Sequence, residues 1–230
     1  TFAAKWLGSS HEVVFVTPNA KWNWIPSNIW VGVGQMSKEE VTFDLAPVYK
    51  KAGITYKQAK AVSLNPEGSE TETQPFLTIE YTGQGQEGET EDVTYDYVIN
   101  ATGPKLNVGA TPGLGEGSEL GEHTVSVCTA DHAIHANDEL QKSIEKMKNG
   151  ERQTFLIGTG HGMCTCQGAA FEYIFNVEHE LNKAGVRDMA DMKWISNESF
   201  IGDFGMGGLH MKVGVYVCGL RIFTESLYRE

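Results

Sequence analysis

The sequence contains no uninterrupted apolar run of 18 residues, so no segment is expected to span a membrane as a helix. Basic residues are also scarce, because 18 Lys and Arg stand against 30 Asp and Glu and leave a net charge of −12. Binding to DNA or RNA depends on clustered Lys and Arg, so nucleic acid is not an expected partner. What the 230 residues do have is 40% hydrophobic residues and 26 glycines, enough for a sizeable core with many tight turns.

Cysteine is rare, with four in the chain: Cys128, Cys164, Cys166 and Cys218. A chain of this size with a good core does not need disulfide staples. The uneven spacing, with one C-x-C pair, indicates reactive thiols more than a disulfide framework. The sequence has no initiating Met or targeting segment at its start, and both ends fall inside helical patterns. We therefore expect an internal piece of a longer protein.

The order of apolar and polar segments alternates between strand and helix patterns, which is typical of an α/β fold with parallel sheets. Two units are expected, 1–120 and 121–230. Residues 20–36 are expected to be irregular. The expected strands are 11–17, 54–56, 57–64, 76–82, 95–104, 153–157 and 193–196. The expected helices are 2–7, 42–52, 130–148, 167–184 and 211–230, with Cys218 as a structural residue inside the last one.

The strand expected over 95–104 ends in Ala101, Thr102 and Gly103. A glycine at the end of a buried strand lets the backbone approach a bulky cofactor closely. This ending is similar to the second flavin-contact segment of disulfide-reductase-like flavoproteins. Any buried strand with a glycine turn would give a similar pattern.

A second glycine-rich turn, 158–168, lies between a buried strand and a helix, where dinucleotides are usually held. Cys164 and Cys166 stand where a pyrophosphate would otherwise lie. The positive end of the helix dipole favours a thiolate there, so Cys166 is a candidate reactive thiol and Cys164 a weaker one. The alternative is small residues that pack helix on sheet. With His161 these cysteines do not make a zinc site, because structural zinc needs four ligands.

The third signal is Ser126–His132, before the long helix. Thr129 or Asp131 can cap this helix, which places Cys128 at its N-terminus. His132 follows four residues later and can reach the same face. A thiol beside a His at a helix start is a candidate nucleophile, although a capping loop with a solvated His would look the same.

These segments together resemble the sulfide:quinone oxidoreductase family over nearly the whole chain. The most specific stretches are Trp24–Gly34, which contains IPSNIWVGVG, and Ser126–Ala133, which reads SVCTADHA; His11–Pro18, Asn100–Leu106 and Cys166–Tyr173 add to them. Type II NADH dehydrogenases share the fold but not this cysteine pattern. The resemblance implies two Rossmann-like dinucleotide-binding domains of the FAD/NAD(P) type. The first, 1–120, would bind FAD and carry inserted antiparallel strands, and the second, 121–230, would carry the redox cysteines.

The resemblance also implies an activity and a site. The enzyme would hold FAD, oxidise sulfide to sulfur or polysulfide, and pass electrons to a quinone. It would associate peripherally with a membrane of prokaryotic type, and a homo-oligomer is compatible with it. Cys128 and Cys166 match the redox cysteines, and His132 and Glu172 match positions that help proton transfer. The positions that match flavin-lining segments are Thr17, Asn19, Ala101, Thr102 and Gly103, with Pro26 and Ser27 near the isoalloxazine side.

Some features depart from the family pattern. The N-terminal G-x-G-x-x-G turn is missing, Asp203 stands where some relatives have His, and Cys164 is an extra thiol. Cys164 therefore leaves open which cysteine pairs with Cys128. Two other functions stay open: a flavocytochrome c-type sulfide dehydrogenase, and a non-catalytic flavin-fold sensor of sulfide or persulfide. A plain NADH dehydrogenase is disfavoured because cysteines fill the second glycine-rich turn.

Overall fold

The computed structural model describes residues 6–7, 10–107, 124–159, 167–196, 198, 200, 201 and 210–229. The chain divides into two compact units. One comprises Thr1–Asn23 and Thr42–Leu106, and the other comprises Trp24–Val41 and Asn107–Glu230. The expected α/β class with parallel strands is confirmed. The domain limits at residues 120 and 121 stay a prediction.

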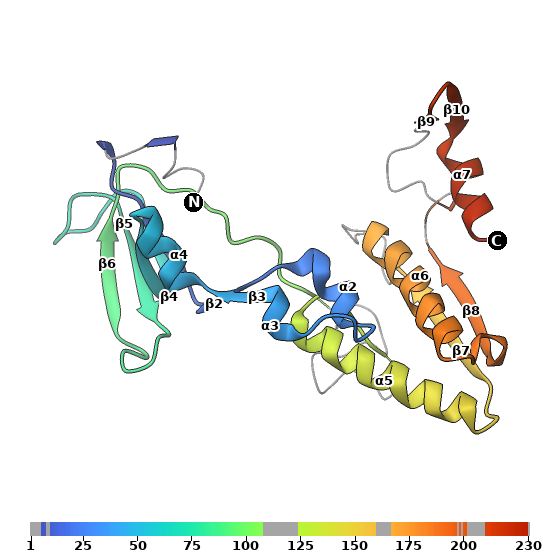
Figure 1. Ribbon diagram of the computed structural model, residues 1–230. Coiled ribbons are helices and arrows are strands. Elements are labelled where there is room, and N and C mark those ends of the chain that lie inside the picture. Colours follow the sequence, from blue (N-terminus) through green and yellow to red (C-terminus); the bar gives the residue numbers. More distant parts are fainter. Residues whose placement is uncertain are drawn as a thin grey trace. The chain divides into compact units, whose positions relative to one another are not determined.

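The first unit is built on a four-stranded sheet in the order β1-β4-β5-β6 (Figure 1). Its strands are β1 (Val14–Thr17), β4 (Thr55–Asn65), β5 (Phe76–Tyr81) and β6 (Thr90–Thr94). β1 runs parallel to β4, whereas β4, β5 and β6 are antiparallel. A short ribbon pairs β2 (Lys21–Asn23) with β3 (Thr42–Asp44). Helix α4 (Leu45–Ala52) follows β3 directly and ends at Gly53, which adopts the left-handed conformation.

Aromatic stacking holds α4 to the sheet of the first unit. The ring of Tyr49 lies 4.6 Å from that of Phe15 on β1 and 5.5 Å from that of Tyr56 on β4. Leu45 and Ile54 complete this core cluster. Offset ring stacking adds to the apolar burial, so this cluster fixes the end of β1, where two of the expected flavin residues lie.

The second unit contains a parallel strand pair, β7 and β8, with helix α6 along it (Figure 1). Its elements are η2 (Ile25–Ser27), α2 (Asn28–Val31), α3 (Lys38–Val41), α5 (Ala130–Lys148), β7 (Gln153–Gly158), α6 (Gln167–Lys183), η5 (Arg187–Met189), β8 (Ala190–Ile195), β9 (His210–Val213), β10 (Tyr216–Gly219) and α7 (Leu220–Leu227). The strong helices over 130–148 and 167–184 and the strand over 153–157 are confirmed. These elements were predictable because their capping residues and apolar periodicity are signals that act over a few residues of sequence.

The core of the second unit forms where α2 contacts both α5 and α6. Ile29 and Val33, from the segment around α2, join Leu140 on α5 and Leu181 on α6 in one buried cluster. The Tyr173 hydroxyl on α6 donates to the carbonyl oxygen of Gly32 at 3.2 Å. The IPSNIWVGVG segment is therefore part of the unit that carries the cysteines.

The expectation of a buried strand over 95–104 is wrong. No strand is assigned there, and Tyr97 and Ile99 are 91% and 75% exposed. The alternation of apolar residues is present, but β-structure needs a hydrogen-bonded neighbour. Among the described residues no strand pairs with this segment, so it is extended without a ladder.

Four other expectations needed correction. The expected helix 211–230 is a hairpin of β9 and β10 followed by α7, and Cys218 lies on β10 opposite Met211. A two-residue turn that begins at Gly214, with φ of +62°, separates two runs of residues that favour β-structure. This arrangement favours a hairpin over a continuous helix. Strands 54–56 and 57–64 are one strand, β4. Residues 20–36 contain β2, η2 and α2, and helix 42–52 begins with β3. The expected helix 2–7 lies mostly outside the described residues.

Candidate functional site

Cys128 lies directly before the N-cap of the 19-residue helix α5. The Thr129 hydroxyl caps the helix by accepting a hydrogen bond from the His132 backbone N–H at 3.1 Å. The Ser126 hydroxyl accepts from the Cys128 backbone N–H at 3.1 Å. The Cys128 thiol is free and exposed. The predicted capping geometry is thus confirmed, and it places an accessible thiol at the positive end of a long helix dipole.

Val127, the residue before Cys128, anchors the loop to the core of the second unit. It packs against the buried cluster that contains Ile29, Leu140 and Leu181. A Cβ built on Gly32 would stand 2.8 Å from Val127 Cγ1 and 3.0 Å from Tyr173 Cε2. Only a glycine fits between these side chains without displacement. The loop before α5 is therefore pressed against the segment that follows α2, and Cys128 is the first residue beyond that contact.

An ion pair joins α3 to the first turn of α5. Lys38 Nζ contacts Asp131 Oδ1. Asp131 stands three residues after Cys128, so its carboxylate would oppose a thiolate there, and Lys38 offsets that charge. Because the Asp131 side chain is 74% exposed, water screens the pair and its contribution to stability is small.

His132 lies in the first turn of α5 and is partly buried. Its Nδ1 is buried and has no hydrogen-bond partner among the described residues. The same holds for Nδ1 of His135, one turn further along the helix. Glu172 lies on α6 with an exposed side chain. Cys164 and Cys166 lie outside the described residues, so their pairing with Cys128 stays a prediction; α6 begins at Gln167, directly after Cys166 in the sequence.

The expected flavin residues of the first unit fall in two places. Thr17 ends β1, and the Asn19 carbonyl accepts a hydrogen bond from the Tyr56 hydroxyl at 2.7 Å. Ala101, Thr102 and Gly103 are exposed. The Asn100 Oδ1 accepts from the Thr102 hydroxyl at 2.9 Å and from its backbone N–H at 3.2 Å, and Gly103 has a φ of +71°. The expected tight turn is present, although the strand before it is not.

The remaining two expected cofactor residues lie in the second unit. Pro26 and Ser27 belong to η2, immediately before α2, and Pro26 is exposed. They therefore share a unit with Cys128. Sequence reasoning did not find this grouping, because nothing in the local pattern of 20–36 shows that its helix packs on α5 and α6.

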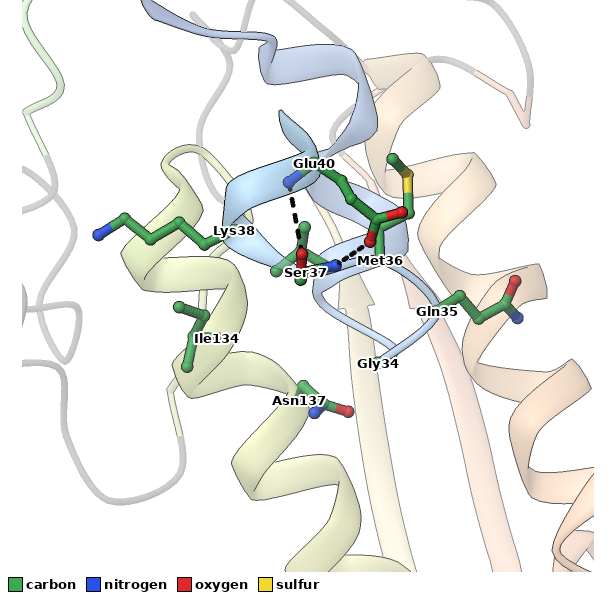
Figure 2. Close-up of a pocket in the computed structure, with 9 residues that line it drawn as sticks. Gly34, Gln35, Met36, Ser37, Lys38, Glu40, Ile134 and Asn137 are labelled. Carbon is green, nitrogen blue, oxygen red and sulfur yellow. Dashed lines mark hydrogen bonds between the residues drawn. The ribbon is translucent and has the colours of Figure 1, made fainter. Parts of the chain in front are cut away.

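A cavity of about 340 Å³ opens between the 34–38 loop and α5 (Figure 2). Ile134 and Asn137 line it from the helix, and Figure 2 shows Gln35 and Lys38 extending out of it in opposite directions. Two of its polar side chains already have hydrogen-bond partners. Gln35 Nε2 donates to Glu180 Oε1 at 2.7 Å, and Glu40 Oε2 accepts from the Ser37 N–H at 2.8 Å. We therefore assign it no ligand.

The described part of the chain offers neither a metal site nor a membrane-spanning helix. No group of three or more His, Cys, Asp or Glu side chains there could hold a metal ion. None of the helices in those residues is both long and apolar enough to cross a bilayer.

The chain is similar to a curated relative and to solved structures. It is 30% identical over 198 residues to the sulfide-quinone reductase of Aquifex aeolicus (strain VF5), which covers 86% of this chain and 40% of that protein. The crystal structure of sulfide:quinone oxidoreductase from Aquifex aeolicus matches with a TM-score of 0.71 and 24% identity, over 99% of this chain and 45% of that one.

Structures of NDH2 from Plasmodium falciparum match more distantly. The complex with NADH has a TM-score of 0.55 over 95% of this chain and 41% of that one, and the complex with RYL-552 has 0.52 over 80% and 36%, both at 18% identity. No model of a protein family matches.

The fold and these similarities assign the chain to a class of proteins, those with an α/β fold of the FAD/NAD(P)-binding type. Within that class, the resemblance to the sulfide:quinone oxidoreductase family is confirmed. The chain spans about 40% of the length of the curated relative it matches.

Proposed function

We propose that the parent protein oxidises sulfide through a cysteine pair and FAD and passes the electrons to a membrane quinone. The observation that carries this proposal is the exposed, free Cys128 at the capped start of α5, in a chain 30% identical to a sulfide-quinone reductase. The expected partners are thus sulfide and quinone, with peripheral association with a membrane. Cys128 and Cys166 are the proposed redox pair, and Cys164 is the alternative to Cys166.

The proposed chemistry starts with the two cysteines joined by a disulfide or by bridging sulfur. Hydrosulfide attacks one sulfur atom, a new S–S bond forms, the old one breaks, and the other cysteine leaves as a thiolate. A thiolate at Cys128 is stabilised by the α5 dipole. The proton of hydrosulfide passes to His132. Two-electron oxidation of the resulting persulfide and thiolate would join the two cysteines through a bridging sulfur, which later leaves as sulfur or polysulfide. Bound FAD would accept these two electrons and pass them to quinone.

The turn at Gly103 supports the proposal of a large planar cofactor, because it is open on its outer side. At Gly103 the space where a Cβ would stand is open, with no atom within 4 Å. The neighbouring Val98 and Ile99 are 47% and 75% exposed, an apolar surface next to a glycine turn. Such a segment allows close backbone approach. Thr17, Asn19 and residues 101–103 would hold FAD, and Pro26 and Ser27 would approach its isoalloxazine side.

The test is reduction of flavin by sulfide in the full-length, FAD-loaded parent protein, followed at the flavin absorbance band. We predict that Cys128→Ser and Cys166→Ser abolish sulfide-driven reduction, because each removes one sulfur of the exchanging pair. Cys218→Ser is the matched control and should react as the wild type does, since Cys218 is partly buried on β10. Cys164→Ser distinguishes the two candidate partners.

The outcomes separate the candidate functions. Near-normal reduction in Cys166→Ser would overturn the pair, and reduction by NADH but not by sulfide would make the protein a respiratory dehydrogenase. Turnover with a soluble quinone analogue, without any haem subunit, would exclude the flavocytochrome-type alternative. Sulfide binding without flavin reduction would favour the sensor.

A further inference from the structure

The hairpin of β9 and β10 exposes an unbroken apolar run, which we call the hairpin tip. Its residues Val215, Tyr216 and Val217 follow one another in the sequence and are 87%, 76% and 65% exposed. Ile222, on the adjoining helix α7, is 67% exposed as well. Single exposed apolar residues are ordinary on a protein surface. Three in succession are unfavourable in water unless they serve a contact.

The hairpin is attached to the rest of the second unit through α7. This helix follows β10 without a break (Figure 1). Directly after it, the ring of Tyr228 lies 5.4 Å from that of Phe171 on α6 and 5.9 Å from that of Trp194 on β8. Edge-on and tilted ring contacts of this kind add to apolar burial. The hairpin tip is therefore carried by a folded element that is packed on α6 and β8.

A lysine stands beside the hairpin tip. Lys212 on β9 lies directly opposite Val217 on β10 in the antiparallel register, so their side chains share one face of the hairpin. Lys212 is exposed. A lysine next to an apolar side chain can lay its aliphatic stem along that neighbour and keep its ammonium group in a polar layer. The pair thus combines an apolar contact with a positive charge.

The charge of this region differs in sign from that of the whole chain. The net charge of residues 210–229 is +2, because three cations stand against one acid, whereas the whole chain has a net charge of −12; the four residues are Lys212, Arg221, Arg229 and Glu225. Anionic lipid headgroups attract cations close to the bilayer surface. Apolar side chains beside such cations enter the boundary between headgroups and acyl chains. The region is therefore complementary to an anionic lipid surface, which would repel an acidic one.

We propose that the hairpin tip docks the parent protein on an anionic lipid surface. Val215 and Val217 enter the boundary between headgroups and acyl chains, and Lys212 contacts the headgroups. Tyr216 lies at headgroup level, where its ring meets apolar atoms and its hydroxyl meets water. This inference rests on the proposed function, since a protein that reduces a membrane quinone must reach the bilayer.

The test is co-sedimentation of the full-length, FAD-loaded protein with vesicles of phosphatidylcholine, either alone or mixed with phosphatidylglycerol. We expect the double variant Val215→Ser, Val217→Ser to bind the mixed vesicles about tenfold or more weakly, because it removes the apolar side chains that enter the bilayer. Lys212→Gln should weaken binding to the mixed vesicles by about fivefold and leave binding to phosphatidylcholine alone unchanged. Val62→Ser is the matched control, since Val62 is an exposed valine on β4 of the first unit.

Wild-type binding by the double variant, or no binding by the wild type itself, would overturn the proposal. If the double variant binds vesicles as the wild type does but changes its oligomeric state, the hairpin tip contacts a second copy of the chain. If it does so but loses FAD or stability, the tip packs against the rest of the parent protein. Lys212→Gln keeps the test decisive if the double variant does not fold.

The docking surface and the proposed function can fail separately. Without vesicles, sulfide should reduce the flavin equally in the wild type and in all variants, because the hairpin tip is not among the proposed redox residues. Normal reduction by a protein that does not bind vesicles would overturn the docking surface alone. Vesicle binding that depends on the tip, without reduction of flavin by sulfide, would overturn the proposed function and leave the docking surface standing.

Discussion

At the scale of single residues, the best-defined polar group outside the proposed site is a cluster on the sheet of the first unit. Lys57 Nζ on β4 lies 2.8 Å from both carboxylate oxygens of Glu91 on β6, and the Tyr81 hydroxyl on β5 also donates to Glu91. Three strands thus meet in one charged group, on the sheet face that also carries the buried Ala59 and Ile79.

The cluster shifts two pKa values in opposite directions. Hydrogen bonds from Lys57 and Tyr81 lower the pKa of Glu91. Burial lowers the pKa of Lys57, but its hydrogen bonds with Glu91 and Tyr81 outweigh this and the net pKa is raised. The Glu91 contribution to stability is therefore present above the unfolded Glu pKa of about 4.3 and is lost as pH falls through the lower folded pKa. The Lys57 contribution is present below about 10.4 and is lost as pH rises through the raised folded pKa.

We predict that Glu91→Gln lowers the free energy of unfolding by about 1 kcal/mol at pH 7. The value is modest because the Glu91 side chain is 40% exposed. The difference between wild type and variant should shrink as pH falls below about 4. Urea unfolding of both proteins at several pH values measures this. A difference that stays constant down to pH 3 would contradict the assignment.

At the scale of elements, the contact that positions Cys128 is the one between α2 and the start of α5. Gly32 has a helical φ of −64°, so an alanine there is not strained in its backbone. Its Cβ would nevertheless stand 2.8 Å from Val127 and 3.0 Å from Tyr173. Overpacking of this kind forces side chains apart.

We predict that Gly32→Ala lowers the free energy of unfolding by about 1–3 kcal/mol. The matched control is Gly168→Ala on α6, whose Cβ would meet no atom within 4 Å. Alanine is the better helix former, so this control should be neutral or stabilising by up to about 1 kcal/mol. Urea unfolding midpoints of the two variants measure this difference in stability. Equal midpoints would mean that α2 does not press on the loop before Cys128.

At the scale of the whole molecule, the chain passes from the first unit to the second at Leu106. Residues 95–107 carry three of the expected flavin positions, Ala101, Thr102 and Gly103, and adopt no helix or strand. Lys105 is exposed there, and it is the one Lys or Arg between Lys60 and Lys142. A single tryptic cut after Lys105 therefore reports on this segment alone over a long stretch of the chain.

We predict that trypsin cuts the FAD-free parent protein after Lys105 and that added FAD slows this cut several-fold, because a bound cofactor would cover residues 101–103. Mass spectrometry of the fragments over time measures the rate, and Lys105→Gln is the control that should resist the cut. The same rate with and without FAD would place the cofactor away from this segment.

The sequence by itself determined the parts of the protein that local signals specify. The α/β class, the capped helix α5 with Cys128 before its Thr129 cap, strand β7 and helix α6 all follow from periodicity and end signals that act over a few residues. Tertiary structure decided the rest. Residues 95–104 would form a strand only with a pairing partner. Helix α2 belongs to the unit of Cys128 because Ile29 and Val33 pack against residues more than a hundred positions away, Leu140 and Leu181. Pairing and packing between distant segments are not encoded in any local pattern, which is why only the folded chain shows that α2 supports the proposed site.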